Sequence, residues 1–304
     1  MKMDLGLKTK KTVSELIFDY GNILLMLIVA VITLYPFLNI LAISLNESVD
    51  SVKGGIHIIP RKFTFANYIS IFTASNLTTD FIISILRTVI GTITGLFSTF
   101  LVSFVLSRKD FASRRLFSAI FVITMYISGG LIPDFILVRN LGLMDNFLVY
   151  IIPNLIWVWN LFVLRSYIES LPYSLQESAK LDGANDFTIM AKIIFPLCLP
   201  VIATIALFIT VGQWNSWFDT YLYCGNNKNL STLQFELMKI LQSAQSQVSS
   251  SRMAHQSEDV LRQQVSPESI KMAITIVATV PILLVYPFLQ KYFVSGLTLG
   301  AVKS

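Results

Sequence analysis

Six long apolar runs, separated by polar connections, constrain the fold more than any other feature of this sequence. They cover about 22–45, 81–106, 116–137, 147–164, 199–218 and 272–290. Each has about 18 residues or more, which is the length that a helix needs to cross a hydrocarbon core of about 30 Å. A spanning segment must also satisfy its own backbone hydrogen bonds, and a helix does so. We therefore predict an all-α polytopic membrane protein with six transmembrane helices.

The scarcity of charge supports this prediction. Charged residues make up 13% of the chain and hydrophobic residues 54%, whereas a soluble domain carries about a quarter charged residues. The formal net charge of +5 comes from basic residues that lie beside the apolar runs. Such residues indicate membrane topology and contact with anionic lipids. Nucleic-acid binding is not expected, because no basic stripe with interleaved aromatic residues is present.

The basic residues also predict the orientation. One short connection carries four of them: Arg108, Lys109, Arg114 and Arg115. Short basic loops remain inside, so we expect both termini to be cytosolic, with residues 1–21 as a cytosolic segment before a membrane domain at 22–304. The first run is too long for the core of a signal peptide, and we interpret it as a retained span. The outer segments are then 46–80, 138–146 and 219–271.

Several runs contain a proline, namely Pro36, Pro133, Pro153 and Pro281. Proline is tolerated in a span when neighbouring groups re-satisfy the freed carbonyl, although such a run could also be a re-entrant segment. The outer segment 219–271 contains a Gln/Ser-rich patch, Gln242–Gln256, which we interpret as flexible or as a helical cap.

The spans carry few groups that could perform chemistry. Arg87 and Asp134 each lie near the outer end of a run, where we expect the side chain to reach water. No GxxxxGK[ST] motif is present, so a nucleotide that powers this protein must bind to another chain. No catalytic pair of side chains is recognisable.

The sequence also shows no metal site or disulfide. His57 and His255 are isolated and are interpreted as satisfied or exposed histidines. Cys198 and Cys224 flank one predicted span, which would hold them too far apart for a disulfide.

The segment 171–197, between the fourth and fifth runs, is the most informative part of the sequence. Ser174 and Glu177 have the spacing of a capping box and predict a helix start. Gly183 suits the end of that helix, and Asn185 or Asp186 can cap a second helix that runs to Phe195, where Pro196 stops or kinks it. The result is a helical hairpin beside the membrane. It could dock on a partner, or it could be an amphipathic interfacial hairpin without one.

This segment resembles the EAA loop of the membrane subunits of binding-protein-dependent ABC importers. The pattern EAA-x3-G-x9-I-x-L-P is matched by Glu177, Ala179, Gly183, Ile193 and Pro196. Ser178 and Phe195 replace the middle alanine and the leucine. The resemblance implies a docking site for an ATPase subunit, which comprises Glu177, Ser178, Ala179, Asp182, Gly183, Ile193 and Pro196. Glu177 would be the polar contact, and Gly183 the position of the turn and of close packing.

The resemblance extends to the rest of the chain. Matching positions include Asn67-Tyr68, Leu141-Gly142-Leu143, Trp214-Asn215 and the tail from Gln290 to Lys303. These are similar to the carbohydrate-uptake branch of the family, which includes MalG-like maltose permeases, and most of all to its LplC/YtcP-type members, which are associated with complex oligosaccharides. The resemblance implies half of a heterodimeric pore in a prokaryotic cell membrane. A second permease, two ATPase subunits that bind ATP and Mg, and an extracellular solute-binding protein would complete the importer.

Seven residues are candidates for contact with an oligosaccharide, because aromatic rings stack on sugars and amides bind hydroxyls. They are Trp157, Trp159, Asn160, Gln213, Trp214, Asn215 and Trp217. Two other interpretations are open. Tryptophans near span ends often form an interfacial belt, and the amides Gln213 and Asn215 could instead bond between helices.

Two other functions compete with the importer subunit. A stand-alone secondary transporter would need no ATPase, but it leaves the hairpin unexplained. A membrane-embedded enzyme is disfavoured by the lack of a catalytic constellation. No cofactor bound by this chain is expected.

Overall fold

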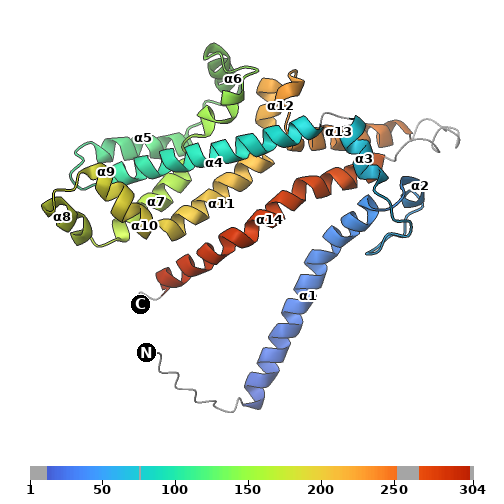
Figure 1. Cartoon of the computed structure of the whole chain (residues 1–304), viewed down its shortest axis with the longest axis horizontal. Coiled ribbons are helices and arrows are strands. Elements are labelled where there is room, and N and C mark those ends of the chain that lie inside the picture. The colour runs from blue at the N-terminus through green and yellow to red at the C-terminus, as the bar shows by residue number, and fades with distance from the viewer. Residues whose placement is uncertain (1–11, 75–76, 252–266, 302–304) are drawn as a thin grey trace. The chain divides into compact units, whose positions relative to one another are not determined.

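The structure is a computed structural model that describes residues 12–74, 77–251 and 267–301 (Figure 1). In these ranges every regular element is a helix, and the one extended pairing is an isolated bridge between Asn46 and Phe63. The all-α prediction is confirmed. The basic residues within 1–11, the histidine at 255, the last five residues of the Gln/Ser-rich patch and Lys303 lie outside the described residues.

Three described helices are long and apolar enough to cross a membrane by themselves. They are α1 (Val13–Ser44), α4 (Leu77–Ser107) and the first part of α14 (Pro267–Ala301). Helix α1 begins where the carboxylate of Glu15 accepts a hydrogen bond from the backbone N–H of Thr12 at 2.8 Å. It carries no charged residue from Gly21 to Ser44, as expected of a helix surrounded by lipid.

The other three apolar runs are bent pairs of helices. Helices α5 (Arg114–Tyr126) and α6 (Leu131–Asn140) meet at 119°, so the predicted run 116–137 is not one straight helix. The break contains Gly130, whose φ of 88° is accessible to glycine without strain. If each bent pair counts as one span, the described residues contain up to six spans.

The second and third bent pairs join short turns to long helices. Two 3-10 turns, Phe147–Tyr150 and Ile152–Asn154, precede α7 (Val158–Ser170) at 46°. The segment Asp186–Leu197 meets α11 (Leu199–Asn215) at 83°.

The chain divides into two compact units. The first unit joins the residues as far as Ser70 with the start of α14, as far as Ile276, and the second unit contains the rest. In the first unit, the buried amide of Asn67 donates to the carbonyls of Ser44 and Asn46, both at 2.9 Å, and accepts from Ser48 in α2 (Ser48–Ser51). Asn67 lies in the first turn of α3 (Ala66–Ala74). This amide therefore joins the end of α1 to the start of α3.

In the second unit, α4 packs along α7 and α11. Its small and hydroxyl side chains allow close contact: Ser103 donates to the carbonyl of Leu161 at 2.9 Å, and the hydroxyls of Thr92 and Thr210 lie 3.1 Å apart. Figure 1 shows α8 (Ser174–Leu181) and α9 (Asp186–Ile189) at one end of α4, and α12 (Phe218–Cys224) and α13 (Leu233–Ser251) near the other. The two ends of α4 hold the two polar sites described below.

Candidate functional site

The segment 171–197 forms a helical hairpin. Helix α8 (Ser174–Leu181) ends at Gly183, whose φ of 79° is the left-handed conformation expected from the sequence. The Asn185 side chain then accepts the N–H of Thr188 at 2.8 Å and caps α9 (Asp186–Ile189). A π-helical turn, Met190–Ile194, and α10 (Phe195–Leu197) complete the hairpin.

Two details of the predicted hairpin differ from the structure. Ser174 is the first helical residue and Tyr173 the cap, so the Ser174–Glu177 capping box does not form. Pro196 does not end its helix, because it occupies the first turn of α10, where its missing N–H costs little. The chain bends instead at Cys198, between α10 and α11.

Helix α8 presents two different faces. The side chains of Gln176 and Ala179 are buried against the rest of the second unit. Glu177 and Ser178 are exposed, and Leu181 is 89% exposed. One face of this short helix therefore packs against the rest of the second unit. We call the exposed side, formed by Glu177, Ser178 and Leu181, the free face of α8.

The remaining predicted hairpin residues divide in the same way. Asp182, Gly183 and Pro196 are exposed, whereas Ile193 is half-buried and packs on the core. The structure adds Phe187, an apolar residue of α9 that is 67% exposed. Sequence reasoning missed Leu181 and Phe187. A signal for them was available in the sequence: both are large apolar residues, and neither is needed for the buried face of the hairpin, which Gln176 and Ala179 already supply.

A buried arginine ties the hairpin to the end of α4. The guanidinium of Arg108 binds the Asp110 carboxylate through two nitrogens, at 2.9 and 2.7 Å. It also donates to Gln176 of α8 at 3.2 Å and lies 2.9 Å from the carboxylate of Asp186 of α9. Lys180 adds a second contact to Asp110 at 2.9 Å. The connection after α4 therefore holds both helices of the hairpin, and we call this cluster the Arg108 clamp.

The clamp shifts the protonation of its carboxylate. Hydrogen bonds from Arg108 and then Lys180 hold the pKa of Asp110 well below its usual range, because both donors favour the charged form. Asp110 is therefore ionised at any pH near neutrality.

An apolar core lies beneath the same hairpin. Ile189 and Ile194 are fully buried, and they pack with Leu164 and Ile168 of α7 and with Phe104 of α4. Burial of a large aliphatic side chain contributes about 1.5–3 kcal/mol. The hairpin is thus held to α4 and α7 by packing as well as by charge.

The other end of α4 contains a second buried arginine. Arg87 is 1% exposed, so the prediction that it reaches water is wrong. Its guanidinium lies 2.6 Å from the Asp219 carboxylate of α12, donates to Gln213 of α11 at 3.2 and 3.3 Å, and stacks 4.4 Å from the centre of the Tyr150 ring. Pairing and hydrogen bonding compensate the burial of this charge. Asp134 is exposed, as expected.

Gln213 therefore takes part in bonds between helices. Besides accepting from Arg87, its amide donates to the carbonyl of Tyr150 at 3.4 Å. A Cβ at Gly91 of α4 would lie 2.7 Å from the Gln213 amide nitrogen, so the glycine makes room for the amide. This is the second interpretation that the sequence left open for Gln213. Contact between Gln213 and a sugar stays a prediction.

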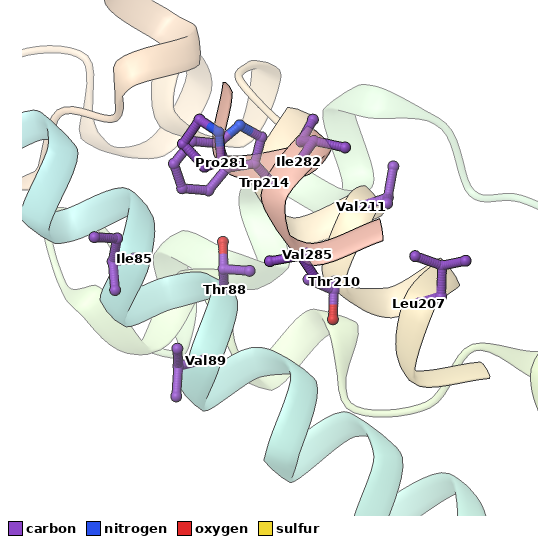
Figure 2. A pocket seen from close by; sticks show the side chains of 10 residues that line it. All are labelled: Ile85, Thr88, Val89, Leu207, Thr210, Val211, Trp214, Pro281, Ile282 and Val285. Carbon is purple, nitrogen blue, oxygen red and sulfur yellow. The ribbon is translucent and has the colours of Figure 1, made fainter. Parts of the chain in front are cut away.

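Trp214 lines an apolar cavity of about 210 Å³. Figure 2 shows the lining side chains, which come from α4, α11 and α14. The indole N–H of Trp214 donates to the carbonyl of Ala278 at 2.9 Å. The two polar residues of the lining, Thr88 and Thr210, donate to the carbonyls of Ser84 and Ala206 at 2.7 Å. Since its polar groups are already bonded, the cavity suits an apolar group better than a sugar.

The other candidate sugar contacts are dispersed. Trp159 and Asn215 are exposed, and Trp157 and Trp217 are half-buried. A Cβ at Gly212 would overlap the Trp157 ring, which packs there. Asn160 is 2% exposed, and its side-chain nitrogen has no hydrogen-bond partner among the described residues. The structure does not bring these residues together in one site, and their contact with sugar stays a prediction.

Three helices long and apolar enough to cross a membrane, together with three bent apolar pairs, are the features of a multi-pass membrane protein. A family model, "Binding-protein-dependent transport system inner membrane component", matches residues 91–299. The chain belongs to this family, whose members are ABC importer permeases.

Relatives and a solved structure agree with this assignment. The chain is 38% identical to the polygalacturonan/rhamnogalacturonan transport system permease protein YtcP of Bacillus subtilis, over 93% of this chain and 96% of that one. It is 36% identical to Protein LplC of the same organism, over 94% and 95%. It also superposes, with a TM-score of 0.81 and 29% identity, on a chain from a bacterial ABC transporter that imports the acidic polysaccharide alginate, covering 94% of this chain and 99% of that one. The type I ABC importer permease fold predicted from the sequence is confirmed.

Proposed function

We propose that this chain is one of two permease subunits of an ATP-driven oligosaccharide importer, and that the hairpin 171–197 receives the movement of an ATPase. The family and the sugar-transporting relatives support the first part. Because the chain belongs to an ABC importer family, the stand-alone secondary transporter is no longer needed as an alternative. The second part depends on the geometry of the hairpin.

The free face of α8 is the observation that carries this proposal. Glu177 and Ser178 offer a carboxylate and a hydroxyl, and Leu181 offers an apolar side chain that the chain itself leaves uncovered. Phe187 extends the apolar surface onto α9. An exposed apolar side chain can anchor a partner protein, and a charged group beside it can supply a polar contact at the rim of the interface. The Gly183 turn keeps the two helices in this relation.

The Arg108 clamp and the Ile189–Ile194 core transmit the movement. A force on the free face passes through Gln176 and Asp186 to Arg108, and so to the end of α4. It passes through the buried isoleucines to α7. Because packed cores move as bodies and do not deform continuously, α4 and α7 follow the hairpin. The spans then exchange an inward-open for an outward-open arrangement.

The proposal fixes the orientation and the partners. The hairpin and both termini face the cytosol, where two ATPase subunits hold ATP and Mg, and a second permease completes the pathway. A solute-binding protein delivers the sugar from outside. The Arg108–Lys109 connection, at the end of α4 that carries the hairpin, obeys the positive-inside rule in this orientation.

Purification of the tagged chain from its native membrane tests the proposal. A second permease and ATPases should be recovered with it, and the reconstituted assembly should take up oligosaccharide only with ATP. Glu177→Gln should weaken the ATPase contact about 10-fold or more, because a charged hydrogen bond contributes about 1.5–3 kcal/mol. Asp134→Asn removes an exposed carboxylate away from the hairpin and should leave the contact unchanged. Uptake by the lone chain in an ion gradient would refute the proposal.

A further inference from the structure

A polar cavity of about 450 Å³ lies beside the hairpin, separate from its free face. It is bounded by the connection after α4, the first turn of α5, the end of α7 and the start of α8. Its lining includes Lys109, Arg114, Arg165, Glu169, Tyr173 and Gln176. Three cations and one carboxylate therefore surround the same space.

The cavity keeps an excess of positive charge after its internal pairs are counted. Arg165 is matched by Glu169, at 2.8 Å, and also donates to Ser118. Lys109 lies 4.7 Å above the Tyr173 ring. Among the described side chains, no carboxylate lies within 4 Å of the Lys109 amine or of the half-buried Arg114 guanidinium. Lys109 and Arg114 thus face the cavity without a described carboxylate paired to them, because Glu169 is paired with Arg165.

The position of the cavity in the fold indicates which kind of anion these cations could bind. It lies where α5 begins, and the next residues of α5, Leu116 and Phe117, are exposed and apolar. Ile120 continues this surface one turn further along the helix. A charged cavity that adjoins an apolar helix surface at the end of a span matches the two parts of a phospholipid.

We propose that this cavity binds the phosphodiester headgroup of an anionic membrane lipid, with its acyl chains along α5. The Arg114 guanidinium can bind two phosphate oxygens at once, and Lys109 supplies a second positive charge. Tyr173 and Gln176 line the cavity and belong to the cap and first turn of α8. The bound headgroup therefore also supports the hairpin from its membrane side. The inference rests on the proposed function in one respect only: the proposed orientation places the lipid headgroup in the cytosolic leaflet.

Lipid binding is tested on the whole importer in nanodiscs of phosphatidylcholine, with or without added phosphatidylglycerol. Native mass spectrometry of the released complex counts the retained lipids of each class. The wild-type complex should retain phosphatidylglycerol selectively. The double variant Lys109→Gln/Arg114→Gln should bind it about 10-fold or more weakly, since each basic residue contributes about a 5-fold gain in attraction to an anionic lipid.

The control variant is Arg115→Gln/Lys192→Gln, which removes the same charge from exposed residues outside the cavity lining. It should retain phosphatidylglycerol as the wild type does. Equal losses in both variants would overturn the site in favour of diffuse attraction. Full displacement by glycerol phosphate would show that the cavity takes a soluble phosphate. A variant that keeps its lipid but loses its ATPase would assign the cations to the ATPase. Each of these three results refutes the proposal without affecting the importer assignment.

Discussion

The guanidinium of Arg108 lies 2.9 Å from the carboxylate of Asp186, across the gap between the connection after α4 and the second helix of the hairpin. The same guanidinium reaches Gln176 in the first helix. Both hairpin helices are therefore attached to one buried side chain at the end of a long span. This contact gives a direct route from a surface that we propose is docked to an ATPase into the transmembrane region.

Arg108→Gln should separate the hairpin from α4. Removal of the guanidinium leaves Asp110 without both of its hydrogen bonds from Arg108, and the loss should be about 1–3 kcal/mol of local stability. Hydrogen exchange should then quicken in α8 and α9, and uptake should fall while the importer continues to hydrolyse ATP. Arg108→Lys keeps the charge but not the fork of donors, so its effect should be intermediate. Unchanged exchange in α8 would show that the clamp does not hold the hairpin.

The clamp should tolerate mild acid. Because the pKa of Asp110 is lowered in the folded chain, its stabilisation is present above the ordinary aspartate pKa and is lost only as pH falls through the lower folded value. Exchange protection of α8 should therefore be the same at neutral pH and in mild acid. Asp110→Asn should lower the exchange protection of α8 both at neutral pH and in mild acid. A loss of protection in mild acid in the wild type, absent from Asp110→Asn, would contradict the lowered pKa.

Gly183 should respond to backbone conformation and not to size. Its φ is 79°, and an added Cβ would meet no atom within 4 Å. Gly183→Ala should cost about 1–2 kcal/mol of hairpin stability, since the left-handed conformation is unfavourable for alanine. Asn tolerates this conformation, so Gly183→Asn should cost less. Gly183→Asp places a charge where the ATPase would pack closely, so it should leave the chain in the membrane but uncouple ATP hydrolysis from uptake.

Comparison of Gly183→Ala, Gly183→Asn and Gly183→Asp distinguishes the role of the turn conformation from the role of close packing against the ATPase. Uptake that follows the order Gly, Asn, Ala indicates that the turn itself matters. Aspartate also tolerates the left-handed conformation, so normal uptake in Gly183→Asp would refute close packing of the ATPase against this turn.

Arg87 and Asp219 should stabilise the second unit only when both charges are present. Arg87→Met leaves the Asp219 carboxylate without its cation, and it should destabilise the second unit by about 3 kcal/mol or more. Asp219→Leu should have a similar cost. The double variant should be more stable than either single one, because no unpaired charge remains. Thermal unfolding of the purified complex measures this coupling, and additive losses would show that the two charges are independent.

The hairpin was largely predictable because its signals are local. Gly183 specifies a helix end, and Asn185 specifies the next start through its own side chain. The π-helical turn after Ile189 was not predicted, because no residue in that stretch forbids an ordinary helix. The failed capping box shows that spacing alone does not decide which of two adjacent residues, Tyr173 or Ser174, becomes the cap.

Features that depend on distant residues were not predictable. Arg87 was expected in water, but its partner Asp219 lies 132 positions further along the chain. Arg108 was used only as a topology signal, and its buried position depends on the folded hairpin. The sharp bend between α5 and α6 had a local signal in Gly129-Gly130, which the apolar run obscured.

Labelling at Leu181 tests the central claim most directly, because this side chain is 89% exposed on the free face of α8 and the native cysteines, Cys198 and Cys224, are buried. Leu181→Cys would be treated with a membrane-impermeant maleimide in intact cells and in inside-out vesicles, with the ATPases present or removed. We expect labelling only in inside-out vesicles, and protection when the ATPases are bound. Labelling of intact cells, or equal labelling with and without the ATPases, would contradict it.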